Sequence, residues 1–190
     1  MRTLTAYNFL TLNGFFKGPQ EDISWHRHGR EEEQYSVQSL QSDSILLFGR
    51  KTYDMMAGFW PTPAAAEQSP EVAAGMNRAE KIVFSRRSFT PQWANTQRIG
   101  GDIVKEMHAL KATPGKNLTI LGSGSIISLF TEHGLIDEYQ FMIDPVAIPE
   151  GTPVVAGITQ KIELELSGST VFESGVVLLS YRTGRTRASA

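Results

Sequence analysis

Apolar and polar residues follow two different patterns along the chain, and the change comes near residue 135. Before it, short apolar runs are followed by segments in which apolar residues recur every three or four positions. The first pattern predicts buried strands and the second predicts amphipathic helices. We expect strands at residues 3–10, 45–48, 81–85, 93–99 and 117–121, and helices at about 31–41, 50–57, 70–79, 102–112 and 126–133.

Beyond residue 135 the pattern predicts strands only. Residues 139–143 and 162–166 alternate, and residues 170–172 and 176–181 flank a Glu-Ser-Gly turn, which predicts a hairpin. The whole pattern predicts an α/β fold of three layers, αβα, with a mixed, mostly parallel central sheet and a C-terminal antiparallel hairpin. No repeat or long linker divides the chain, so we expect a single domain over residues 1–190.

Composition and charge exclude several classes of protein. A formal net charge of -2 argues against a nucleic-acid binder, which would show a basic stripe. The absence of cysteine excludes a disulfide framework and a thiolate metal site. We see neither a signal peptide nor a membrane-spanning apolar run, so we expect a cytoplasmic protein without a membrane partner. The histidines form no zinc-hydrolase pattern, so we expect no metal site: His26, His28, His108 and His133.

Three predicted strands are each followed by residues that suit phosphate groups. In an open α/β sheet, ligands bind beyond the carboxyl ends of parallel strands. Glycine turns at helix N-termini offer backbone N–H groups to a diphosphate, and guanidinium groups suit a phosphate monoester. A diphosphate and a separate phosphate are what NADP carries, although each motif alone would also fit a plain tight turn. The motifs are Gly49-Arg50-Lys51-Thr52, Ser85-Arg86 and Gly122-Ser123-Gly124-Ser125.

These motifs and several other segments occur in the same order along the chain as the motifs of one known family. The matching segments are Leu12-Asn13-Gly14-Phe15, Asp22-Ile23-Ser24-Trp25, Phe48 to Tyr53, Val83 to Arg86, Leu121 to Ser125 and Leu135 to Tyr139. Over nearly its whole length the chain resembles the riboflavin-biosynthesis reductase domain, the C-terminal domain of the bifunctional deaminase-reductase, which has a dihydrofolate reductase-like fold. The resemblance implies a stand-alone, NADPH-dependent reductase that forms a homodimer. The zinc deaminase signature needs cysteines, which this chain lacks.

The resemblance also implies roles for particular residues. The adenosine side of NADPH, with its 2′-phosphate, would be held by Gly49, Arg50, Lys51, Thr52, Ser85 and Arg86. The diphosphate would be held by Gly122, Ser123, Gly124, Ser125 and Ile126. On the substrate side we expect Asn13, Trp25, Phe59 and Trp60.

The first loop differs from the family pattern, which usually has Asp-Gly where this chain has Asn13-Gly14. An asparagine side chain can hydrogen-bond a substrate but cannot deliver a proton as an acid. The sequence therefore leaves the proton donor open among Asp22, His26 and a bound water.

The leading functional hypothesis is an oxidoreductase that transfers a hydride from NADPH to a C=N or C=O carbon of a small heterocyclic or sugar-like substrate. Such an enzyme would be similar to 5-amino-6-(5-phosphoribosylamino)uracil reductase or dihydrofolate reductase. The alternative is an NADP-binding or sensing protein that keeps the cleft without catalysis, for which Asn13 is the motivation. A third hypothesis is a structural dimer with a vestigial cleft.

Overall fold

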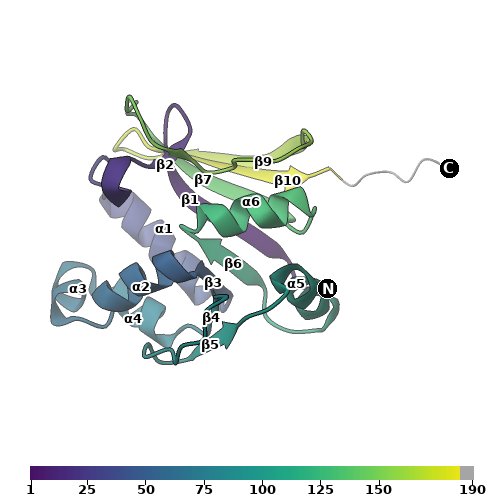
Figure 1. Cartoon of the computed structure of the whole chain (residues 1–190). Helices are drawn as coiled ribbons and strands as arrows, with labels where there is room; N and C mark the ends of the chain where they lie inside the picture. The colour runs from purple at the N-terminus through teal and green to yellow at the C-terminus, as the bar shows by residue number, and fades with distance from the viewer. Residues whose placement is uncertain (185–190) are drawn as a thin grey trace.

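An eight-stranded mixed sheet forms the middle layer of the computed structural model, which describes residues 1–184 (Figure 1). Six neighbouring strands run parallel in the order β5-β4-β3-β6-β1-β7, and β10 pairs antiparallel with both β7 and β9. The predicted mostly parallel sheet and the C-terminal hairpin are therefore confirmed. The strands of this sheet are β1 (Leu4–Thr11), β3 (Ile45–Gly49), β4 (Lys81–Phe84), β5 (Thr96–Ile99), β6 (Leu118–Leu121), β7 (Glu138–Asp144), β9 (Leu164–Val171) and β10 (Val177–Thr183).

Helices cover both faces of this sheet, which confirms the three-layer prediction. On one face, α5 and α6 pack on a core that includes Leu47, Ile120 and Phe130. On the other face, α1, α2 and α4 pack on two smaller cores that include Phe48 and Met142. The helices are α1 (Arg30–Gln41), α2 (Arg50–Phe59), α3 (Pro63–Gln68), α4 (Pro70–Arg78), α5 (Ile103–Ala112) and α6 (Gly124–Glu132), with a 3-10 turn at Pro19–Glu21.

Several local predictions differ from the structure. Helix α3 was not predicted, although Thr62 caps its N-terminus by accepting a hydrogen bond from Ala65 N, and Pro63 begins it. The two short strands predicted at residues 162–166 and 170–172 are one strand, β9, with an irregular pairing opposite Ser180 and Tyr181. A second, small sheet, β2 (Phe15–Lys17) with β8 (Thr152–Pro153), was also missed because each strand is only two or three residues long.

The alternating pattern of β7 predicts which residues are buried on one face of the strand only. Tyr139 is buried as expected, but Met142 and Asp144 on the opposite face are buried as well. Strand β7 lies inside the sheet between β1 and β10, and cores on both faces cover it. Asp144 is thus a fully buried carboxylate at the carboxyl end of a central strand.

Candidate active site

The carboxyl ends of β4, β3, β6 and β1 lie next to one another at one edge of the sheet. The connection after β3 enters α2 on one face, and the connection after β6 enters α6 on the opposite face. Neighbouring parallel strands whose connections diverge in this way form the ligand crevice of open α/β sheets. The strands that carry Gly49, Ser85 and Gly122 at their carboxyl ends are therefore parallel neighbours, the arrangement that a shared crevice requires.

The turn after β6 is tied to the turn after β3 by one buried hydroxyl group. Gly49 N donates a hydrogen bond to Ser123 Oγ at 2.9 Å, and Ser123 Oγ donates to Leu121 O at 3.0 Å. Ser123 is 3% exposed, so its side chain serves this contact. In the described chain, no acceptor is recorded for Gly124 N or Ser125 N in the first turn of α6, whereas Ile126 N donates to Ser123 O.

Two glycines in the turn after β6 are required by the backbone and by close packing. Gly122 has a φ of +59°, in the left-handed region that favours glycine, and its carbonyl accepts a hydrogen bond from Thr52 Oγ1. A Cβ at Gly124 would lie 2.5 Å from the ring of Phe16, in β2. The small β2–β8 sheet therefore lies directly against the N-terminus of α6 and borders the crevice there.

Arg50 lines a groove of about 380 Å³ between α2 and residues 89–92. Its Nε donates to both carboxylate oxygens of Asp54 at 2.8 Å, and its guanidinium carbon lies 3.5 Å from the centre of the Phe89 ring. Stacking and pairing fix the guanidinium plane at the groove wall. Lys51 is exposed, with its ammonium group 3.9 Å from Glu21 Oε1.

The turn after β4 presents arginine side chains. Ser85 Oγ donates to the carbonyl of Arg87 at 2.8 Å, which holds the turn in shape, and Arg86 and Arg87 are exposed. Arg98, from the neighbouring strand β5, donates from Nη1 to Ser85 O at 2.9 Å. Sequence reasoning missed Arg98; the signal for it was its place near the end of a predicted strand.

Asn13 uses both ends of its amide within the protein. Its Oδ1 accepts from Thr11 Oγ1 at 2.8 Å, and its Nδ2 donates to Ile148 O at 2.8 Å. The side chain thereby links the loop after β1 to the loop after β7. An ionised aspartate could accept a hydrogen bond from Thr11 but could not donate one to the Ile148 carbonyl. The two contacts therefore explain why asparagine suits this position.

The four residues expected on the substrate side fall into two separate groups. Trp25 is half-buried after β1, where its Nε1 donates to Asp22 O and its ring meets His26 edge-on. Trp60 ends α2, packs in the core below it and donates from Nε1 to Met56 Sδ. Phe59, 39% exposed, contacts Trp60. The recorded contacts of Phe59 and Trp60 are with α2 and α4, whereas Asn13 and Trp25 contact the loops at the sheet edge.

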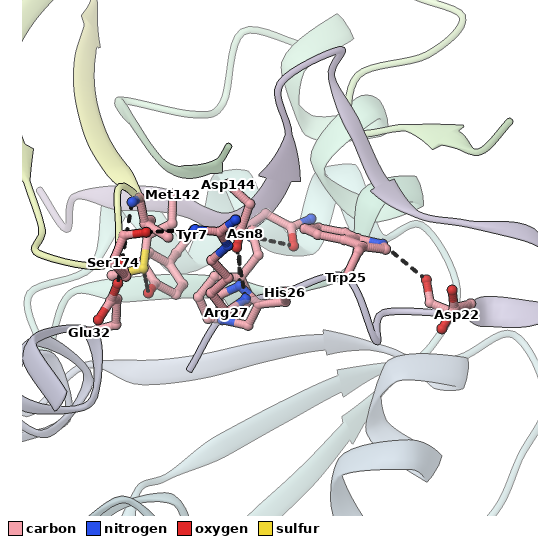
Figure 2. Close-up of polar contacts among 12 residues, drawn as sticks. Tyr7, Asn8, Asp22, Trp25, His26, Arg27, Glu32, Met142, Asp144 and Ser174 are labelled. Atoms are coloured by element: carbon pink, nitrogen blue, oxygen red, sulfur yellow. Dashed lines mark hydrogen bonds and ion pairs between the residues drawn. The ribbon is translucent and has the colours of Figure 1, made fainter. Parts of the chain in front are cut away.

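A buried histidine–carboxylate pair lies beside Trp25 (Figure 2). His26 Nδ1 lies 2.8 Å from Asp144 Oδ2, and the other carboxylate oxygen accepts from Arg27 N at 2.8 Å. The two side chains are 4% and 0% exposed, and the His26 ring stacks on Phe9 with 3.8 Å between centroids. His26 was one of the three candidate acids expected from the sequence, whereas Asp144 was not expected. The signal for Asp144 was a carboxylate directly after the apolar residues 141–143 of a predicted strand.

His28 gives this region a pH dependence. His28 is exposed as a whole residue, but partial burial of its ring, with a smaller contribution from the positive charge of His26, lowers the pKa of His28 from its usual 6.5. Near and below pH 6.5 the unfolded chain then binds more protons at this histidine than the native protein does. The free energy of unfolding should therefore decrease as the pH is lowered. We expect urea denaturation to show a larger loss of stability from about pH 7.5 to about pH 5.5 in the wild type than in His28→Gln. Equal losses in both proteins would contradict this.

Within residues 1–184, no helix has the length and apolar character needed to cross a membrane. In the same described residues, no group of three or more histidine and carboxylate side chains is placed to hold a metal ion.

The layers, the strand order and the diverging connections define an α/β domain of the dihydrofolate reductase-like class. The chain belongs to the family of the RibD C-terminal domain, whose sequence model matches residues 2–178. It is 30% identical over 174 residues to the protein YyaP of Bacillus subtilis (strain 168), covering 90% of each chain.

Two solved structures show the same fold. A protein named for riboflavin biosynthesis from Shewanella sp. PV-4 has a TM-score of 0.77 and 19% identity, with 96% of this chain and 99% of that chain covered. The diaminohydroxyphosphoribosylaminopyrimidine deaminase/5-amino-6-(5-phosphoribosylamino)uracil reductase of Thermotoga maritima has a TM-score of 0.65 and 13% identity. The match covers 96% of this chain and 57% of that longer one. The family is one of reductase domains.

Proposed function

We propose that this protein is an NADPH-dependent reductase that transfers a hydride to a C=N or C=O carbon of a small heterocyclic or sugar-like substrate. The observation that supports the proposal most is the meeting of three phosphate-suited turns, after β3, β4 and β6, at one edge of the sheet. Membership of a family of reductase domains supports the same class of reaction.

The hydrogen-bond donors at this edge suit the diphosphate and the 2′-phosphate of NADPH. Gly124 and Ser125 supply backbone N–H groups without recorded acceptors in the described chain, as a diphosphate at a helix N-terminus requires. Arg86 supplies an exposed guanidinium for the 2′-phosphate, and Arg50 lines the groove between α2 and residues 89–92. NADPH would supply the hydride, and the protein would orient the two reactants and exclude water.

The substrate is proposed to resemble the pyrimidine that the Thermotoga enzyme is named for, 5-amino-6-(5-phosphoribosylamino)uracil. The protein would then act in riboflavin biosynthesis. Substrate would approach the nicotinamide from the side of Asn13 and Trp25. Phe59 and Trp60 would contribute only from the far end of α2.

Titration with NADPH, followed by the nicotinamide fluorescence, tests the cofactor. We expect saturable binding, followed by oxidation of NADPH at 340 nm when 5-amino-6-(5-phosphoribosylamino)uracil or dihydrofolate is added. No binding at physiological NADPH concentrations would refute the proposal. Tight binding without turnover on either compound would instead favour the NADP-binding, non-catalytic alternative.

We also propose a homodimer that forms through the late antiparallel strands. Strand β9 ends the sheet, and Leu166 and Val171 on it are 59% and 74% exposed. We expect light scattering to give twice the mass of the chain, and Leu166→Lys to shift the protein towards monomer. A wild-type mass equal to one chain would contradict the dimer; a dimer unchanged by Leu166→Lys would contradict this interface.

A further inference from the structure

We propose that His26 delivers the proton that completes the reduction, and that Asp144 is the residue that positions its ring. The inference rests on the proposed function and supplies the acid that Asn13 cannot be. Three observations carry it: the buried hydrogen bond between the two side chains, its place at the edge of the sheet, and the second ring nitrogen of His26.

The carboxylate fixes which nitrogen of His26 carries a proton. Asp144 Oδ1 is occupied by Arg27 N, so Oδ2 is the acceptor that faces His26 Nδ1 at 2.8 Å. A carboxylate can only accept, so Nδ1 must carry hydrogen. In the neutral ring Nε2 is then bare, and in the imidazolium Nε2 carries the proton that can be transferred. Stacking on Phe9 fixes the plane of the His26 ring, and the hydrogen bond to Asp144 fixes its rotation in that plane.

The pair lies where the substrate would meet the cofactor. Asp144 is the last residue of β7 and stands opposite Thr11, the last residue of β1. The hydroxyl of Thr11 holds Asn13, and Trp25 meets His26 edge-on, so both substrate-side candidates at this edge are linked to the pair, Trp25 directly and Asn13 through Thr11. Figure 2 shows His26 between Asp144 and Trp25, on the segment that follows β1 and β2.

The second nitrogen of His26 is available for transfer. No hydrogen bond to His26 Nε2 is recorded from residues 1–184, although Nδ1 is paired. The charged and titratable groups near the pair include Arg27 and His28 on the same segment, Glu32 on α1 and Tyr7 on β1, and the Arg27 guanidinium donates to Ser174 O. Glu32 hydrogen-bonds Ser174 and Tyr7 donates to Met142 Sδ, so neither group occupies Nε2.

The step is balanced with NADPH as reductant. A hydride leaves NADPH and forms a C–H bond at the substrate carbon, which breaks the π bond of C=N or C=O and gives NADP⁺. The electron pair moves to the nitrogen or oxygen, which takes the proton from His26 Nε2. His26 is left neutral, with its remaining proton on Nδ1 and hydrogen-bonded to Asp144, and Nε2 is protonated again from solvent before the next turnover.

The experiment combines ¹⁵N NMR of the histidine rings with kinetics on three full-length variants. Asp144→Asn preserves size and should move the neutral-ring proton to Nε2, because the amide N–H₂ would face Nδ1. We expect Asp144→Asn and His26→Gln to bind NADPH as the wild type does. Their kcat with 5-amino-6-(5-phosphoribosylamino)uracil or dihydrofolate should fall about 10²-fold, with little change in KM. If His26 is the acid, the wild-type kcat should decline at alkaline pH, where Nε2 has lost its proton. The matched control, His28→Gln, should keep the wild-type kcat and this decline.

The possible outcomes distinguish a failure of the His26 acid role from a failure of the proposed reductase function. Loss of kcat and of its alkaline decline in His26→Gln and Asp144→Asn, with NADPH binding kept, would support the acid role; a merely structural pair would not change the pH profile. Unchanged kcat in Asp144→Asn, with the tautomer moved, would overturn the inference and leave the reductase intact. A wild type that neither binds nor oxidises NADPH would remove the proposed function and the inference together. If His26→Gln fails to fold, the near-isosteric Asp144→Asn decides the question.

Discussion

Replacing Arg86 by alanine should weaken NADPH binding about tenfold and leave NADH binding nearly unchanged. The two cofactors differ only by the 2′-phosphate, and a charge-assisted hydrogen bond to such a group contributes about 1.5 kcal/mol at the lower end of its range, or about tenfold in affinity. The lower end applies because Arg86 is exposed to solvent and to screening. Fluorescence titration of both cofactors at fixed ionic strength measures the difference.

Arg87→Ala is the matched control for this prediction. Arg87 is the adjacent residue, is equally exposed, and contributes its carbonyl rather than its side chain to the turn through Ser85 Oγ. We expect it to change NADPH affinity less than Arg86→Ala does. Equal losses of NADPH and NADH affinity in Arg86→Ala would remove Arg86 from the 2′-phosphate role and would indicate a distorted turn.

Truncating either of two consecutive residues in β3 should destabilise the protein severely. Leu47 and Phe48 are each 0% exposed, and they pack in the cores on opposite faces of the sheet. Leu47→Ala should lower the free energy of unfolding by about 2–5 kcal/mol and Phe48→Ala by about 3–5 kcal/mol, because each leaves a cavity in a close-packed core. Urea denaturation with an unchanged m-value measures these losses.

The comparison tests the three-layer architecture itself. A sheet covered on one face would lose stability at one of the two positions only, since neighbouring residues in a strand point to opposite faces. Met55→Ala serves as the control, because Met55 on α2 is 47% exposed and its truncation should cost less than about 0.5 kcal/mol. A small effect at either Leu47 or Phe48 would contradict helices packed on both faces.

The sequence was sufficient for the architecture because the central strands are buried on both faces. Continuous apolar runs such as residues 45–48 and 82–84 are typical of central strands, and the glycines and polar residues after them mark where each strand ends. The parallel direction of these strands then follows from the alternation of strands and helices along the chain. Short or weakly patterned elements, such as α3 and the β2–β8 pair, carried too little periodicity to be found this way.

The details of the site could not be predicted because they depend on contacts between residues far apart in sequence. Ser123 meets Gly49 across 74 positions, and His26 meets Asp144 across 118. Nothing local indicated that Ser123 would use its hydroxyl inside the protein or that Asn13 would have both ends of its amide occupied. The sequence identified the residue types at the sheet edge, and tertiary packing decided which atoms remain available.

The position of β6 has a consequence for how the chain acquires its structure. Strand β1 is made first, but both of its neighbours, β6 and β7, come from the second half of the chain, and β6 also separates β1 from β3. The first half alone therefore cannot form a continuous sheet during synthesis. Pairing of such distant segments requires a large loss of loop-closure entropy, so refolding should be slow for a protein of this size. Strand β1 should stay unpaired until β6 and β7 are in place.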